Sequence, residues 1–350
     1  MLQFLRILLF ILLLFLVMIF YLWSENLWVS LLLLVLSDII SLKFIPLFLK
    51  PKLKSSTYLF LKYSCYILLP ILSAVFCRVF LFEVFVVPSS SMKKTISIND
   101  IILTNKLAYG PAISNKASDI PFASLFIRET ANNKKQTKYK RLSGFSNIKR
   151  HDIIVYSRDN ENHTYYVKRI IGMPGDTLEI IDSNVFINNV KLRELKNYVF
   201  EYHEMKDSLN NNSFYLSNSE YSTLKNKNTL KRNIHKSKKH VDMIFPKEQV
   251  FDWTRDNYGY VVIPAKEGTV DINTNSYFLY KSIIELELEA IPRFDKKRDL
   301  FSIQGNQFSS YSFKNDYYFV IGDNRHNSND SRHIGFISED NIIGRVDYIF

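Results

Sequence analysis

The chain has 350 residues, of which 15% are aromatic, and a formal net charge of +11. A basic chain can bind nucleic acid or an anionic membrane surface. Its basic residues lie in Asn- and Lys-rich stretches without a nucleic-acid-binding motif, so we expect no nucleic-acid partner. Cys65 and Cys77 lie too far apart along one apolar segment to form a disulfide if that segment is a helix. Since no Cys/His spacing typical of zinc occurs, we expect no metal and no cofactor.

The apolar N-terminal 80 residues are predicted to form a membrane anchor of three transmembrane helices, at about 4–23, 27–42 and 57–79. The first apolar run is longer than the core of a cleavable signal peptide and lacks a small-residue cleavage site after it. Asp38 interrupts the second run. Such an acid either faces a neighbouring helix or marks a functional site, and the first alternative is the commoner one.

Positive charge predicts the orientation of this anchor. The connection between the second and third runs is rich in lysine, with Lys43, Lys50, Lys52, Lys54 and Lys62, whereas Ser24-Glu25-Asn26 between the first two runs has no lysine or arginine. The positive-inside rule places the lysine-rich connection and the N-terminus in the cytoplasm. We therefore expect a multi-pass protein of the inner (plasma) membrane, whose residues beyond 80 lie outside the cytoplasm.

The remainder is predicted to be mainly β. Strands are expected at 80–87, 100–107, 152–156, 165–171, 258–264, 282–288, 317–321 and 342–350, with a hairpin over 177–192 that turns at Asn188-Asn189. The polar stretch 110–149 indicates an insertion or a mobile loop. Residues 193–315 are rich in Asn, Lys and Ser, and include a basic run at 225–239. These patterns predict an antiparallel β core over 81–192 and 316–350, interrupted by an inserted β subdomain with flexible basic loops.

Three polar stretches within this β region carry candidate chemistry: PSSSM at 88–92, YYVKRIIGMPGD at 165–176 and GDNRHNSNDSR at 322–332. A serine becomes a useful nucleophile only when a base removes its proton. Lys168 and Arg169 interrupt an otherwise apolar strand, and since side chains alternate along a strand, one of the two must point towards the core. Burial lowers the pKa of a lysine, which makes Lys168 a candidate base.

In this order, the three stretches resemble conserved boxes of the bacterial type I signal peptidases. The resemblance extends over residues 78–107, 150–192 and 317–350. It implies a catalytic β domain with a Ser/Lys dyad, in which Ser91 is the nucleophile and Lys168 the general base. By the same resemblance, the Ser91 backbone N–H and the Ser89 hydroxyl form the oxyanion hole.

The resemblance also assigns supporting and substrate-binding residues. Ser328 orients the lysine, and Asp330 and Arg332 form an ion pair that holds the loop. The substrate is a signal-peptide-bearing preprotein of the Ala-X-Ala type, which adds as an extended strand beside the chain before Ser91. A shallow apolar pocket for its small side chain is formed by Val87, Pro88, Met92, Ile96, Tyr166 and Val167. No carboxylate is expected close to the Lys168 ammonium.

Three positions depart from the family pattern, which usually has Pro where Lys94 stands, Gly where His151 stands and often Gly where Ser90 stands. Alternatives to this hypothesis remain. His326 or His333 lies close in sequence to Ser328 and Asp330, so either could belong to a Ser/His/Asp triad. The cytoplasmic self-cleaving repressors also use a Ser/Lys dyad, although three transmembrane segments argue against them. A catalytically inactive, membrane-tethered receptor or scaffold is the alternative of another class.

Overall fold

The computed structural model describes residues 2–24, 27–40, 50–51, 54–114, 139–157, 164–204, 213–224, 230–234, 244–247, 251–295 and 300–350. The chain forms two compact units. The first comprises residues 1–83 and 106–145, and the second comprises residues 84–105 and 146–350.

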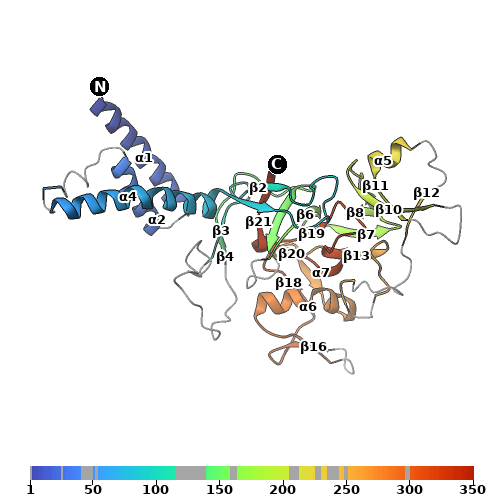
Figure 1. Ribbon diagram of the computed structural model, residues 1–350. Coiled ribbons are helices and arrows are strands. Elements are labelled where there is room, and N and C mark those ends of the chain that lie inside the picture. Colours follow the sequence, from blue (N-terminus) through green and yellow to red (C-terminus); the bar gives the residue numbers. More distant parts are fainter. Residues whose placement is uncertain are drawn as a thin grey trace. The chain divides into compact units, whose positions relative to one another are not determined.

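The first unit is mainly helical (Figure 1). Its elements are α1 (Leu2–Ser24), α2 (Leu27–Ile40), α4 (Ser55–Phe76), the π-helix η1 (Cys77–Leu81) and the hairpin strands β3 (Ala112–Ser114) and β4 (Tyr139–Arg141). Phe20, Phe80 and Leu142 form its small buried core. Over the part of the chain that the structure describes, no helix combines the length and the apolar character needed to cross a membrane. The three transmembrane segments stay a prediction.

Among the described residues of this unit, two acidic side chains are buried. Asp38 on α2 is 8% exposed, and Glu83 at the start of β1 (Phe82–Val86) is also 8% exposed. Glu83 pairs with two cations, because Arg78 Nη2 lies 2.9 Å and Lys106 Nζ 2.8 Å from its carboxylate oxygens. These pairs satisfy a charge that burial would otherwise make costly.

A seven-stranded sheet organises the second unit, in the order β1-β2-β21-β5-β6-β19-β20. Its further strands are β2 (Ile101–Asn105), β5 (Ile153–Ser157), β6 (Tyr165–Gly172), β19 (Tyr317–Ile321), β20 (Ile337–Ser338) and β21 (Ile342–Ile349). The registered pairs from β2 to β20 are antiparallel. The mainly β, antiparallel fold class is thereby confirmed.

The sheet curls so that strands far apart in its order come together. β1 is the first strand and β6 the fifth, yet the rings of Phe85 and Tyr165 lie 4.8 Å apart between their centroids. Register shifts at Leu103/Thr104 and Ile342/Gly344 increase the local twist that such curling needs. The curl brings the segment after β1 near the strand that carries Lys168.

Smaller sheets extend this unit. One has the order β13-β7-β8-β9, with β7 (Thr177–Ile181), β8 (Asn184–Ile187), β9 (Val190–Lys191) and β13 (Tyr258–Val262); another has the order β11-β10-β12, with β10 (Val199–Glu204), β11 (Ser213–Ser217) and β12 (Leu230–Arg232). The remaining strands are β14 (Thr269–Asp271), β15 (Arg293–Asp295), β16 (Leu300–Ile303), β17 (Asn306–Gln307) and β18 (Ser310–Ser312). The short helices are α5 (Asn218–Thr223), α7 (Ser331–Ile334) and the 3₁₀ turn η5 (Glu339–Asn341).

Two details differ from the sequence-based expectations. The hairpin over 177–192 is a three-stranded meander, because a first turn at Asp182-Ser183 precedes the expected turn at Asn188-Asn189. The strand expected at 282–288 is wrong, since these residues belong to helix α6 (Thr274–Leu288). Asn273 caps this helix with a capping box, and this start signal lies well before the apolar stretch that resembled a strand.

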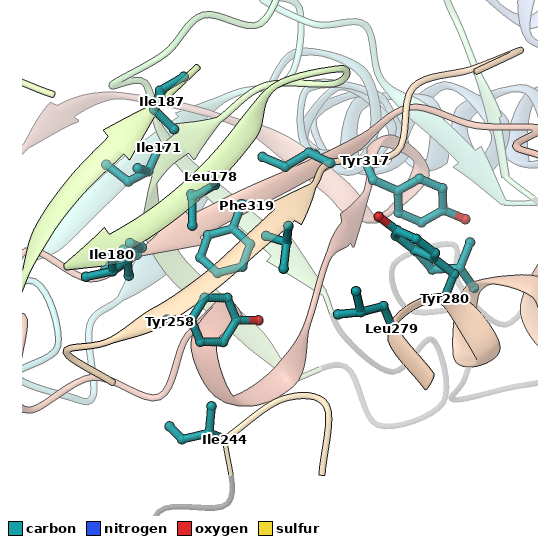
Figure 2. Packing of buried hydrophobic residues seen from close by; sticks show 14 of the residues in the cluster. Ile171, Leu178, Ile180, Ile187, Ile244, Tyr258, Leu279, Tyr280, Tyr317 and Phe319 are labelled. Carbon is teal, nitrogen blue, oxygen red and sulfur yellow. The ribbon is translucent and has the colours of Figure 1, made fainter. Parts of the chain in front are cut away.

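The main core of this unit is rich in aromatic side chains, and Figure 2 shows how they pack. Phe319 of β19 and Tyr258 of β13 are fully buried, with ring centroids 5.6 Å apart. Tyr280 of α6 and Ile171 of β6 belong to the same cluster. The core thus joins residues of the predicted catalytic region and of the 193–315 segment. The limits of an inserted subdomain stay a prediction, and most of the 110–149 and 225–239 loops lies outside the described residues.

Candidate active site

Ser91 begins a tight turn just beyond β1. The backbone N–H of Lys93 donates to the Ser90 carbonyl at 3.0 Å, and that of Ile96 donates to the Met92 carbonyl at 2.8 Å. Met92 and Ile96 are each 1% exposed, so they anchor the turn in the apolar interior. The Ser91 side chain is held on this anchored turn and is itself mostly buried.

Lys168 lies on β6, directly opposite Ile154 of β5. Its Nζ is 2.8 Å from Ser91 Oγ and 2.9 Å from the Val167 carbonyl oxygen. Only 3% of the lysine is exposed. The structure therefore brings together the two residues that the sequence proposed as nucleophile and base, which are 77 positions apart.

Burial lowers the pKa of Lys168 to about 8, while the negative charge of Asp330 acts in the opposite direction. Among the described residues, Lys168 forms no ion pair with a carboxylate, and Asp330 binds Arg332 instead. A lysine with this pKa is partly neutral near neutral pH and can accept a proton from a hydroxyl within hydrogen-bond reach.

The neighbouring cation, Arg169, is also buried, which the sequence argument did not anticipate. Its Nε and Nη2 donate to the two carboxylate oxygens of Asp323 at 2.8 and 2.6 Å. Asp323 accepts a further hydrogen bond from the hydroxyl of Thr95, within the Ser91 turn. Lys168 and Arg169 are both buried, and Arg169, which stays charged, needs a buried anionic partner. That need is the signal that could have identified Asp323.

Asn324 is a second residue that sequence reasoning missed. Its backbone N–H donates to the Ser91 carbonyl at 3.0 Å, and its side-chain amide donates to the Ser90 carbonyl at 3.0 Å. The loop after β19 therefore holds the backbone of the Ser91 turn directly. No local pattern in the sequence indicates this contact.

The predicted oxyanion and orienting serines are near the dyad. Ser89 is exposed, and its Oγ lies 3.4 Å from Ser91 Oγ. Ser328 Oγ is buried and has no hydrogen-bond partner among the described residues, so its predicted contact with Lys168 is not formed in this state. The roles of both serines stay predictions.

Asp330 and Arg332 form the expected pair. Arg332 Nε and Nη2 donate to the two carboxylate oxygens of Asp330, each at 2.9 Å, and both side chains are buried. The Asp330 carboxylate also accepts the Gly322 backbone N–H at 3.1 Å. The Arg332 guanidinium holds the pKa of Asp330 well below its usual range, although burial opposes this effect. The pair closes the base of the loop that carries Asp323 and Asn324.

Four of the six predicted pocket residues pack in one apolar cluster: Val87, Met92, Ile96 and Val167. Pro88 is exposed, and the ring of Tyr166 stacks on that of Tyr156 with centroids 5.6 Å apart. Met92 and Ile96 are too buried to form more than the floor of a pocket. The use of these residues for substrate binding stays a prediction.

Two of the unusual positions have left-handed backbone conformations. His151 has a φ of 73°, which agrees with the glycine expected there. Lys94 has a φ of 72°, a value that proline cannot adopt, so the turn after Ser91 differs locally from one with proline at this position.

The histidine alternative has little geometric support. His326 Nδ1 accepts the Glu201 backbone N–H at 3.0 Å, and its Nε2 lies 3.0 Å from Asp256 Oδ1. Both of its ring nitrogens are therefore engaged away from Ser91. His333 Nδ1 lies 3.9 Å from Asp330, whose carboxylate already binds Arg332. The described residues also contain no group of three His, Cys, Asp or Glu side chains placed to hold a metal ion.

Comparisons with known proteins indicate the family of this chain. The family model described as "Signal peptidase, peptidase S26" matches residues 60–350. Signal peptidase I of Buchnera aphidicola subsp. Baizongia pistaciae is 30% identical over 287 residues, which cover 80% of this chain and 74% of that protein. Signal peptidase I of Rickettsia bellii (strain OSU 85-389) is 28% identical and covers 81% of this chain and 70% of its own length.

A solved structure of a signal peptidase I from Enterococcus faecalis V583 is 19% identical to this chain. The match covers 58% of this chain and 98% of that chain, with a TM-score of 0.24. The match of the family model over most of the sequence shows that the chain belongs to the signal peptidase family, peptidase S26.

Proposed function

We propose that this signal peptidase is a membrane-anchored serine endopeptidase that cleaves signal peptides from exported preproteins after small residues, of the Ala-X-Ala type. The observation that supports this mechanism most directly is the 2.8 Å separation of Lys168 Nζ and Ser91 Oγ inside a buried site. Family membership supports the reaction class, and the geometry supports the assignment of the two reacting groups.

In the proposed reaction, neutral Lys168 takes the proton from the Ser91 hydroxyl as Oγ attacks the scissile carbonyl carbon. The Ser91 backbone N–H and the Ser89 hydroxyl stabilise the oxyanion of the tetrahedral intermediate. The lysine then gives its proton to the leaving amine, which releases the mature protein and leaves an acyl-enzyme at Ser91. A water molecule, deprotonated by Lys168, hydrolyses this ester and restores both residues.

The preprotein would lie extended along β1, whose alternating side chains Phe82, Val84 and Val86 are exposed. Main-chain hydrogen bonds to a strand edge would supply affinity, and the small apolar pocket would exclude bulky side chains. Tyr166 and Val167 on β6 would form the other wall of this groove.

The anchor and the orientation belong to the same proposal. Apolar side chains on α1, such as Ile11, Phe15 and Leu22, are exposed, as a helix that contacts lipid requires. The lysine-rich connection supports a cytoplasmic N-terminus and an extracytoplasmic catalytic region at the inner membrane. The bilayer is then a partner as well as the preprotein.

The test is cleavage of an Ala-X-Ala precursor by the full chain in detergent. We expect Ser91→Ala and Lys168→Met each to abolish cleavage while the circular dichroism spectrum stays that of the native protein. Full activity of either folded variant would contradict the dyad. Failure of the wild-type chain to cleave the precursor would instead favour the inactive receptor or scaffold.

A further inference from the structure

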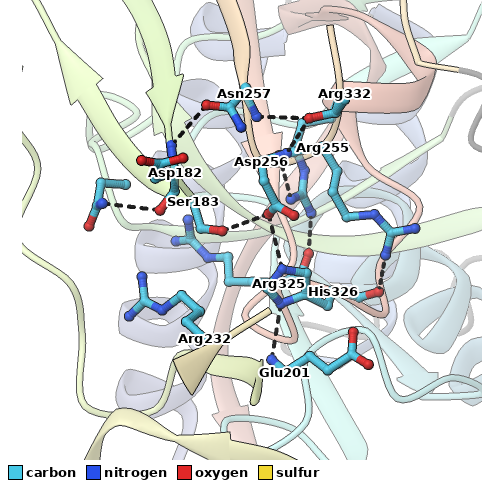
Figure 3. Close-up of polar contacts among 12 residues, drawn as sticks. Asp182, Ser183, Glu201, Arg232, Arg255, Asp256, Asn257, Arg325, His326 and Arg332 are labelled. Atoms are coloured by element: carbon cyan, nitrogen blue, oxygen red, sulfur yellow. Dashed lines mark hydrogen bonds and ion pairs between the residues drawn. The ribbon is translucent and has the colours of Figure 1, made fainter. Parts of the chain in front are cut away.

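A buried polar cluster outside the dyad connects the 193–315 segment to the loop after β19 (Figure 3). This loop, residues 322–330, is called the active-site loop below. It consists of Ser183 in the β7–β8 turn, Asp256 before β13, and His326 in the loop after β19. Their exposed fractions are 6%, 1% and 5%. Ser183 Oγ donates to Asp256 Oδ1 at 2.7 Å, and His326 Nε2 lies 3.0 Å from the same oxygen.

This cluster contains the three residue types of a serine-protease triad, but its connections differ from those of a triad. In a triad the histidine contacts the serine and relays its proton. Here Ser183 and His326 both contact the carboxylate, and each is almost completely buried. The cluster therefore offers no accessible nucleophile. Its hydrogen bonds hold three separate segments of the chain together.

The hydrogen bonds fix the tautomer of His326. Its Nδ1 accepts the backbone N–H of Glu201 on β10, so Nδ1 must carry a lone pair. The proton of the neutral ring is then on Nε2, which donates to Asp256. One imidazole ring thus binds two separate parts of the 193–315 segment at once.

Further contacts join the same two segments beside His326. The Val199 N–H donates to the Asp323 carbonyl at 2.8 Å, and the Arg325 N–H donates to the Val199 carbonyl at 2.9 Å. Arg255 Nη1 donates to the His326 carbonyl at 2.6 Å. The start of β10 therefore pairs with the loop as a short parallel bridge.

The loop after β19, which His326 holds in place, also contacts the backbone of the nucleophile. Asn324, two residues before His326, binds the Ser90 and Ser91 carbonyls, and Asp323 binds Arg169 next to the base. Displacement of His326 would therefore move the groups that hold Ser91 and Lys168 at their present separation. Small displacements of reacting groups have large effects on rate.

We propose that His326 is a positioning residue for signal-peptide cleavage, through which Asp256 and β10 of the 193–315 segment hold the active-site loop against the Ser91 turn. This inference rests on the proposed function, because it requires Ser91 as the nucleophile. It gives the 193–315 segment a role in catalysis without any contact between that segment and the reacting atoms.

The experiment measures kcat and KM of the full chain in detergent with an Ala-X-Ala peptide. We expect His326→Ala to lower kcat by about 10-fold to 100-fold and to leave KM unchanged, because the loop positions reacting groups and does not line the proposed substrate groove. His326→Asn keeps an acceptor near the Nδ1 position, and His326→Gln keeps a donor near the Nε2 position, so each should restore part of kcat. His203→Ala, two residues beyond Glu201 on β10, is the matched control and should retain wild-type kcat.

A double-mutant cycle with Asp256→Ala separates positioning from general destabilisation. If His326 acts through Asp256, the double variant loses no more kcat than the more impaired single variant. Thermal unfolding monitored by near-ultraviolet circular dichroism identifies any variant that is not folded at the assay temperature. If His326→Ala is not folded, the Asn and Gln variants and Asp256→Ala provide the test.

Any one of three results would overturn the inference. They are wild-type kcat in folded His326→Ala, independent losses of kcat in the double-mutant cycle, and an equal loss of kcat in His203→Ala. Full activity of Ser91→Ala would instead overturn the proposed function, and this inference with it. An inactive Ser91→Ala variant together with a fully active His326→Ala variant would overturn the positioning role alone.

Discussion

Lys168 combines two properties that usually conflict, since it is a cation by default and yet lies on a buried strand. Water is excluded from its ammonium, and no carboxylate among the described residues forms an ion pair with it. The protonated form is therefore destabilised, and the pKa falls to about 8. The same burial that makes the lysine costly to the fold makes it useful as a base.

The pH dependence of cleavage follows from this pKa. The base must be neutral, so we expect kcat/KM to rise about tenfold per pH unit below about pH 8 and to level off above it. The measurement is peptide cleavage from about pH 6 to about pH 10 in detergent. An acid limb with its midpoint near 10.5, the ordinary lysine value, would contradict the role of burial.

Stability should depend on pH through the same residue. The unfolded chain has a lysine pKa near 10.5 and the folded chain about 8, so the unfolded state binds more protons between these values. The free energy of unfolding should then rise as pH increases through this window, by about 3 kcal/mol relative to Lys168→Met. Urea unfolding of both proteins at about pH 7 and about pH 10 measures this difference. A difference that does not vary with pH would show that the lysine titrates normally.

At the scale of the elements, the loop after β19 decides the geometry of the site. It approaches the Ser91 turn so closely that only glycine fits at its first position. A Cβ added to Gly322 would lie 2.2 Å from Ser328 Oγ and 2.6 Å from the Ser91 carbonyl oxygen. The constraint is lack of space, and it involves the backbone of the nucleophile itself.

We therefore expect Gly322→Ala to lower kcat by about 100-fold, because the added methyl group displaces the Ser91 backbone. Its cost in stability should be about 1–3 kcal/mol. Gly305→Ala is the control, since its φ of 88° makes alanine strained while its Cβ would meet no atom of the described residues within 4 Å. This control should lose about 1 kcal/mol and keep its activity. Equal kcat values for the two variants would contradict the expectation.

At the scale of the whole molecule, the chain joins an apolar helical N-terminus to a β-rich enzyme. The proposed membrane anchor would place the enzyme at the membrane, close to its proposed preprotein substrates. The charge asymmetry of the connections supports one orientation, with five lysines around the second connection and none in the first.

This topology predicts the behaviour of reporter fusions. A reporter that is active only outside the cytoplasm should be inactive when fused after residue 50 and active when fused after residue 350, because the lysine-rich connection stays inside. A reporter that is active only in the cytoplasm is the matched control and should give the reverse pattern. Activity of the first reporter at residue 50 would reverse the proposed orientation.

The sequence alone determined the strand that precedes Ser91, the strand that carries Lys168, the identity of these two residues as candidates, and the family. These features depend on local patterns, such as alternating apolar residues, a proline that ends a strand, and short motifs whose residue types carry chemistry. The strand expected at 282–288 failed because Ile283 and Ile284 favour a strand locally, whereas burial against the core at helical spacing favours α6. Only the tertiary structure decided three contacts: that of Arg169 with Asp323, that of Asn324 with Ser91, and that of His326 with Asp256 and Glu201. Each joins residues from separate segments, and only the folded chain brings those segments into register.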